Sequence, residues 1–189
     1  MVETLNQNIT SASLNNLEQE KKNMKTVKKL IDILNTGNID KVHELIHDEY
    51  FNHESNIDIS NIYLPSDTIK TIEKRSKLRG LEEFIDTVKS IRNAFSGLLY
   101  KEKEICAMGE IVFSRFIISG IHTGTFFIFP PSGNKFTYQA VHIHRFLDDK
   151  VIEHKAVRDD LTFMMQLGLV QPIKKFESFF NFWKQKSRQ

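Results

Sequence analysis

The residues of this chain best suited to chemistry lie in two neighbouring strand-like runs near its end. His142 and His144 stand two residues apart in the first run, Glu153 and Lys155 stand two apart in the second, and Asp159 follows the second run. Imidazole and carboxylate groups exchange protons near neutral pH once burial and nearby charges have adjusted their pKa values. These residue types therefore predict acid/base chemistry, provided that the fold brings them together.

The two runs are joined by Asp148-Asp149, which predicts a tight hairpin. In such a hairpin, even residues of one strand share a face with odd residues of the other. His142 and His144 are then predicted to share a face with Glu153, Lys155, Val157 and Asp159, and the opposite face is predicted to carry Arg145, His154 and Arg158. The first face is either solvated or lines a cavity, and one extra residue would reverse the pairing.

The pair His142 and His144 also has the spacing by which one strand offers two metal ligands. Asp148 or Glu153 would be the third ligand. The glycine framing and the downstream histidine of cupin-like sites are missing, so the sequence favours a site without metal.

Periodicity predicts helices first and strands later in the chain. Apolar spacing indicates helices over 27–34, 39–46, 81–95 and 161–167. Alternation and β-branched content indicate strands over 99–107, 111–121, 125–129, 135–146 and 151–158. This order of elements predicts an α+β domain with a largely antiparallel sheet.

The chain divides into three predicted parts. Residues 1–20 are polar and aperiodic, which predicts a mobile leader. Residues 21–170 form the domain, with a loop insert at about 54–78. Residues 171–189 form a helical tail whose aromatic face would cover the core or pack on a second subunit, so we expect a homodimer.

Composition excludes several classes of protein. No apolar run approaches the roughly 20 residues of a membrane span, and no secretory signal is visible, so we expect a cytoplasmic protein without membrane contact. The single cysteine excludes an internal disulfide and a multi-cysteine zinc site. A net charge of +2 is too small to indicate nucleic-acid binding.

An ordered set of motifs resembles the SnoaL-like polyketide (ester) cyclase family. The motifs are GIHTG at 120–124, PPSG at 130–133, HRFLDDKVIEH at 144–154, DDL at 159–161 and QLG at 166–168. Upstream, NTGNID at 35–40 and FNH at 51–53 are similar to the family's opening helix and following histidine. The resemblance covers about residues 27 to 169.

This resemblance implies a fold and an activity. The fold is the cone-shaped α+β fold of the nuclear transport factor 2 superfamily, in which a curved antiparallel or mixed sheet wraps around a pocket closed by N-terminal helices. The activity is aldol ring closure of a polyketide ester without metal or organic cofactor, with an acid/base aspartate that matches Asp159. His142, His144 and His122 become candidate hydrogen-bond donors or orienting groups for a small apolar carbonyl compound. Residues expected to line the pocket are His53, Phe51, Phe126, Phe129, Tyr138, Lys155 and Val157.

Two observations keep an alternative open. Lys155 stands where the family has tryptophan, and Asp159 precedes a helical run that it can simply cap. His122 can likewise serve only to hold a loop. The alternative is a non-catalytic ligand-binding or dimerisation module of the same superfamily.

Overall fold

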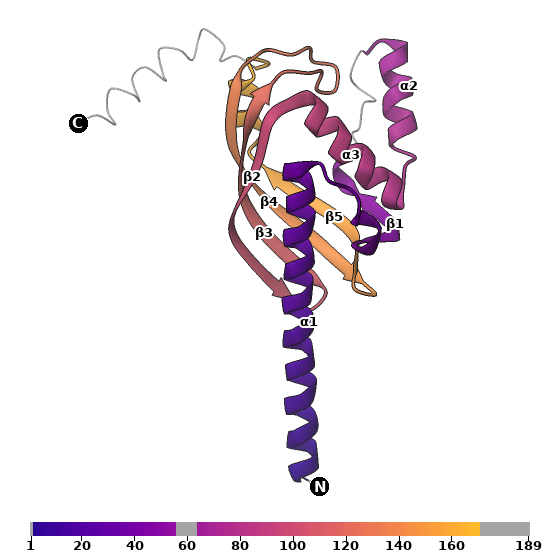
Figure 1. The fold of residues 1–189 in the computed structure, drawn as a ribbon, viewed down its shortest axis with the longest axis vertical. Helices are drawn as coiled ribbons and strands as arrows, with labels where there is room; N and C mark the ends of the chain where they lie inside the picture. Colours follow the sequence, from indigo (N-terminus) through magenta and orange to yellow (C-terminus); the bar gives the residue numbers. More distant parts are fainter. Residues whose placement is uncertain (1, 56–63, 171–189) are drawn as a thin grey trace, which may run out of the picture.

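The computed structural model describes residues 2–55 and 64–170, which fold as helices packed on one five-stranded sheet (Figure 1). The strand order is β1-β5-β4-β3-β2. β1 (Ile46–Asn52) runs parallel to β5 (Lys150–Arg158), whereas β2 (Phe95–Met108), β3 (Ile111–His122) and β4 (Lys135–Leu147) make antiparallel pairs. The predicted α+β class with a curved, mixed sheet is confirmed.

Within the described residues, four α-helices accompany the sheet. They are α1 (Val2–Thr36), α2 (Ser66–Arg75), α3 (Gly80–Ala94) and α4 (Asp160–Gln166), and short 3-10 turns cover Val42–Glu44 and His53–Ser55. Figure 1 shows α1 running beside the sheet, with its N-terminal half extending beyond the sheet's end. Across the described ranges, no helix combines the length and apolar character needed to cross a membrane.

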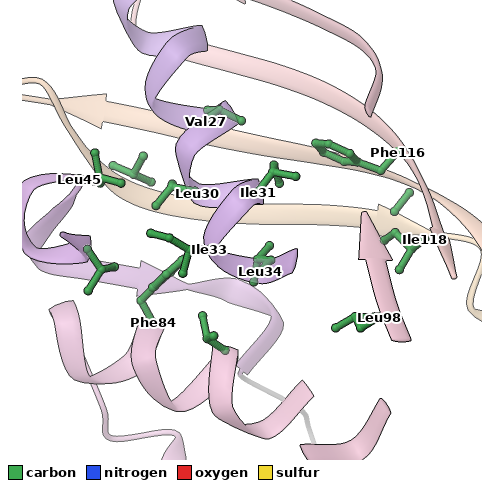
Figure 2. Close-up of a cluster of buried hydrophobic side chains, with 14 of the residues drawn as sticks. Val27, Leu30, Ile31, Ile33, Leu34, Leu45, Phe84, Leu98, Phe116 and Ile118 are labelled. Atoms are coloured by element: carbon green, nitrogen blue, oxygen red, sulfur yellow. The ribbon is translucent and has the colours of Figure 1, made fainter. Parts of the chain in front are cut away.

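One face of the sheet, the inner face, carries the core. Along β3, buried and less buried residues alternate, so Val112, Phe116 and Ile118 all point inward with at most 1% of their surface exposed. The predicted apolar stripe of α1 packs against this face through Val27, Leu30, Ile31 and Leu34 (Figure 2). Phe84 of α3 joins the same core, so both long helices are held by burial of apolar side chains.

Truncating Val27 tests whether α1 is part of the folded domain. Its side chain is fully buried, so Val27→Ala is expected to lower the free energy of unfolding by about 2 kcal/mol. Leu17→Ala, on the same helix but 46% exposed, is the matched control and should change it by less than about 0.5 kcal/mol. Urea unfolding measures both values. Equal effects of the two substitutions would show that α1 does not pack as described.

Three predicted elements are wrong or differ in extent. The short helix over 39–46 is only a 3-10 turn, because Ile46 begins β1 and pairs with β5. The strand over 125–129 is absent, since Phe126 and Phe129 exchange backbone hydrogen bonds with each other in a tight loop. The polar stretch expected to be a leader is helical from Val2 onward, because it lacks glycine and proline and continues the helix that α1 forms on the sheet.

The insert expected at about 54–78 contains a helix. α2 begins after Pro65 and ends at Arg75, where the sequence indicates no more than a single helical turn. Residues 56–63 and the tail at 171–189, including its predicted aromatic face, lie outside the described residues.

Candidate functional site

The site is created by an irregularity in the pairing of β4 with β5. Asp148 and Asp149 both have positive φ and form the predicted two-residue turn, so Leu147 pairs with Lys150. A β-bulge after Arg145 then shifts the register by one residue. The predicted distribution of side chains over the two faces is therefore wrong beyond the bulge.

The shifted register gathers three histidines on the inner face. His144 pairs with His154, and His142 pairs with Ala156 on β5 and with Ser114 on β3. Glu153, Lys155 and Val157 move to the opposite, outer face. His142 and His144 are only 7% and 5% exposed, and one ring nitrogen from each of the three histidines lies within 4.8 Å of the others.

Asn52 fixes the protons of this cluster. The backbone N–H of Glu54 donates to Asn52 Oδ1 at 3.1 Å, which identifies that atom as the amide oxygen. His154 Nδ1 lies 2.8 Å from the same oxygen and must carry the hydrogen that it donates. In the neutral ring, His154 Nε2 then bears a lone pair and accepts from His142 Nδ1 at 3.0 Å. The remaining nitrogen, His142 Nε2, is left with a lone pair.

All three rings are neutral at pH 7. Burial, followed by the neighbouring His144 and Arg158, lowers the pKa of His142 to about 3. Burial lowers the pKa of His144 to about 4. Burial, followed by the neighbouring His142, His144 and Arg158, holds the pKa of His154 well below its ordinary value. The lone pairs of the cluster are therefore available near neutral pH.

Several polar atoms of the cluster have no hydrogen-bond partner among the described residues. These buried atoms are Ser114 Oγ, His142 Nε2 and His144 Nδ1. A buried polar group without a partner costs about 1–3 kcal/mol, so these groups together make the cluster a candidate binding site. Ser114 was not predicted from the sequence, although it lies two positions from both Val112 and Phe116 on a predicted strand and must therefore share their face.

Aromatic side chains border the polar atoms. The rings of Phe116 and Tyr100 lie edge-on to His142, with centroids 5.3 and 5.9 Å away. Burial raises the pKa of Tyr100 to about 12, so its hydroxyl stays protonated and can donate. The inner face thus combines an apolar wall with lone pairs and hydroxyl groups, an arrangement that can orient a polar ligand atom or bind a cation.

Comparison with known proteins places the chain in a family. The SnoaL-like polyketide cyclase pattern matches residues 54–167. The chain belongs to the SnoaL-like polyketide cyclase family. Over 143 residues it is 29% identical to aklanonic acid methyl ester cyclase DnrD of Streptomyces peucetius, a match that covers 75% of this chain and 88% of that protein. It is 28% identical to nogalonic acid methyl ester cyclase of Streptomyces nogalater over 140 residues, with 74% and 92% covered.

Solved structures of other proteins share the fold. TsrD from Streptomyces laurentii superposes with a TM-score of 0.60 at 19% identity, covering 77% of this chain and 97% of that one. A SnoaL-like polyketide cyclase from Agrobacterium tumefaciens gives a TM-score of 0.57 at 14% identity, with 76% and 95% covered. At these identities the comparison shows the common architecture.

Asp159, the predicted acid/base residue, lies at the N-terminus of α4. Its carboxylate is exposed and accepts the backbone N–H of Thr162 at 3.1 Å, which is the geometry of a helix cap. The preceding Arg158 lies near the histidines and forms ion pairs with Glu54 and Asp160, each at 3.1 Å. Asp159 thus caps α4 and does not belong to the histidine cluster.

His122 lies apart from the other three histidines. It is fully buried, and its Nδ1 accepts the backbone N–H of Ser132 at 3.3 Å, so it ties the GIHTG strand end to the PPSG loop. Phe126, from the predicted pocket wall, packs nearby on Phe95 and Phe163. Tyr138 also contacts Phe163, whereas Phe129 makes the loop bridge to Phe126.

The other predicted ligand-binding residues gather on the outer face around Glu153. The carboxylate of Glu153 lies 2.6 Å from His53, 2.9 Å from Arg145 and 3.2 Å from Lys155. These hydrogen bonds, that of Arg145 first, lower the pKa of Glu153 to about 2. Phe51 lines the same outer hollow, of about 390 Å³, and Val157 is exposed. This ion-pair network is therefore on the opposite side of the sheet from the cluster of His142, His144 and His154.

Proposed function

We propose that this chain binds a small carbonyl compound at the polar end of the inner face, bounded by Ser114, His142 and His144. The observation that carries the proposal is the group of buried polar atoms without partners beside an aromatic wall. A ligand carbonyl oxygen can accept the Ser114 hydroxyl proton, and an apolar ligand body suits the rings of Phe116 and Tyr100. Because these atoms are buried, we also propose that the side chains covering them move when the ligand enters.

We further propose that the bound compound undergoes ester cyclase chemistry with Asp159 as the acid/base group. The carboxylate takes a proton from the carbon beside one carbonyl, that carbon forms a bond to a second carbonyl carbon, and the resulting alkoxide is protonated. Support comes from the family membership and from relatives named as cyclases of methyl esters. Ser114 is then the donor that stabilises the enolate oxygen.

The second candidate is ligand binding without chemistry. It is favoured by the exposure of Asp159 and by its bond to Thr162, which already gives the carboxylate a structural role. The predictions of a homodimer and of a cytoplasmic location stay predictions.

Calorimetry and product analysis with aklanonic acid methyl ester as the probe separate these candidates. Ser114→Ala is expected to weaken binding about tenfold, the value of one buried hydrogen bond, while Ser119→Ala on the outer face leaves it unchanged. Asp159→Asn retains a capping side chain, so it should keep binding and lose at least about 100-fold in the rate of ring closure.

Each contrary outcome has a clear meaning. Binding that Ser114→Ala leaves unchanged would place the ligand elsewhere. Ring closure that survives in Asp159→Asn would remove Asp159 as the acid/base group. Binding by the native protein without any ring closure would establish the second candidate for this ester.

A further inference from the structure

We propose that His142, His144 and His154 form a binding site for one divalent transition-metal ion, for which zinc is the best match. The sequence shows two ligands on one strand, and the bulge in the hairpin supplies the third by turning His154 to the inner face. Three imidazole nitrogens with an open fourth position are a frequent ligand set of catalytic zinc. The inference rests on side-chain geometry and is independent of the proposed reaction.

The spacing of the nitrogens is close to what zinc requires. Zinc–nitrogen bonds of about 2.0–2.1 Å place the nitrogens of a tetrahedral site about 3.4 Å apart. His142 Nδ1 and His154 Nε2 are 3.0 Å apart, and one ring nitrogen from each of the three histidines lies within 4.8 Å of the other two. We expect rotation of the rings to bring three nitrogens to the spacing that zinc needs.

The surroundings also resemble those of a metal site. Ligating histidines usually donate their second ring N–H to an oxygen, and His154 Nδ1 does so to Asn52 Oδ1 at 2.8 Å. The backbone N–H of Asn52 in turn donates to the buried carboxyl group of Glu83 at 3.1 Å, which helps to hold Asn52 in place. His142 Nε2 and His144 Nδ1 are buried without partners among the described residues, so both rings can change tautomer.

Proton balance is simple in this site. For zinc to bind between His142 and His154, the hydrogen on His142 Nδ1 has to move to Nε2, a buried atom without a hydrogen-bond partner among the described residues. A neutral ring that only changes tautomer releases no net proton. Arg158 lies close enough to disfavour a second positive charge, which is the main reason to expect a weaker site than a structural zinc centre.

The experiment uses the full-length, untagged protein after treatment with chelator and dialysis. Zinc content by mass spectrometry is expected to reach one ion per chain, and cobalt is expected to give the visible absorption of a low-symmetry nitrogen-ligated site. His144→Gln should weaken zinc binding at least 100-fold. His43→Gln, which changes an exposed histidine outside the cluster, should not affect it.

Zinc-edge X-ray absorption of the native protein supports the test without any variant. The expected spectrum shows three imidazole nitrogens at about 2.0 Å from zinc. The proposal is overturned if zinc remains substoichiometric when supplied in excess, if fewer than three imidazoles ligate it, or if a folded His144→Gln binds it as tightly as the native chain.

Discussion

Acidification of the metal-free protein from pH 6.5 to pH 5 is expected to lower its free energy of unfolding by about 2 kcal/mol for each buried histidine that stays neutral. The folded pKa values of His142 and His144, about 3 and 4, lie below the ordinary value of 6.5 that applies to the unfolded chain, and that of His154 is lowered as well. Below pH 6.5 the unfolded state therefore binds more protons. Stability is complete above this pH and declines as the pH falls towards the folded pKa values.

Urea unfolding in the presence of chelator, repeated at pH 7, 6 and 5, measures this decline. Carboxylates with ordinary pKa values titrate mainly below this range, so the slope reports chiefly on histidines. His142→Gln is expected to make the slope shallower, and the exposed His43→Gln should leave it unchanged. A pH-independent free energy of unfolding would mean that the three rings are solvated.

The second large effect is expected from Gly124→Ala, because this glycine marks the junction of the GIHTG segment with α3. An added Cβ would lie 2.0 Å from the backbone oxygen of Asn93, and the backbone N–H of Gly124 donates to Ala94 at 2.9 Å. Neither neighbour is a flexible side-chain end. We expect the substitution to cost more than about 4 kcal/mol or to prevent folding, as only severe steric conflicts do.

Gly97→Ala is the matched control, since a Cβ there meets nothing within 4 Å and only the positive φ of 59° opposes it. A cost of about 1–2 kcal/mol is expected for that strain. Thermal unfolding compares the two variants. Equal losses would contradict the close approach of Gly124 to Asn93 and would weaken the structural explanation of the motif.

Secondary structure was predicted correctly where the apolar residues of a segment follow one clear spacing, either helical or strand-like. The stripe from Val27 to Leu34 and the alternation along β3 each specify one buried face, and both are confirmed. Residues 39–46 were predicted to be a helix because Ile39, Val42 and Ile46 fit helical spacing, and the strand β1 that begins at Ile46 was not predicted. Its pairing with β5, distant in the chain, decides the outcome.

The site was harder to predict because it depends on one bulge. The tight turn at Asp148-Asp149 was predicted correctly. Counting odd and even positions from that turn nevertheless assigns His154 to the wrong face. No local pattern marks the bulge after Arg145. Asn52, which orders the cluster, lies 102 residues away from His154 and is brought beside it only by the parallel β1–β5 pair.

Nitrogen NMR of the histidine rings in the metal-free protein at pH 7 tests the central claim most directly. The cluster is expected to show three neutral rings, with His154 and His142 both protonated on Nδ1 and His142 Nε2 carrying a bare lone pair. That result would establish an ordered cluster with one lone pair available for a ligand. Charged rings, or a hydrogen on Nε2 of His142, would contradict the order of hydrogen bonds described for the cluster.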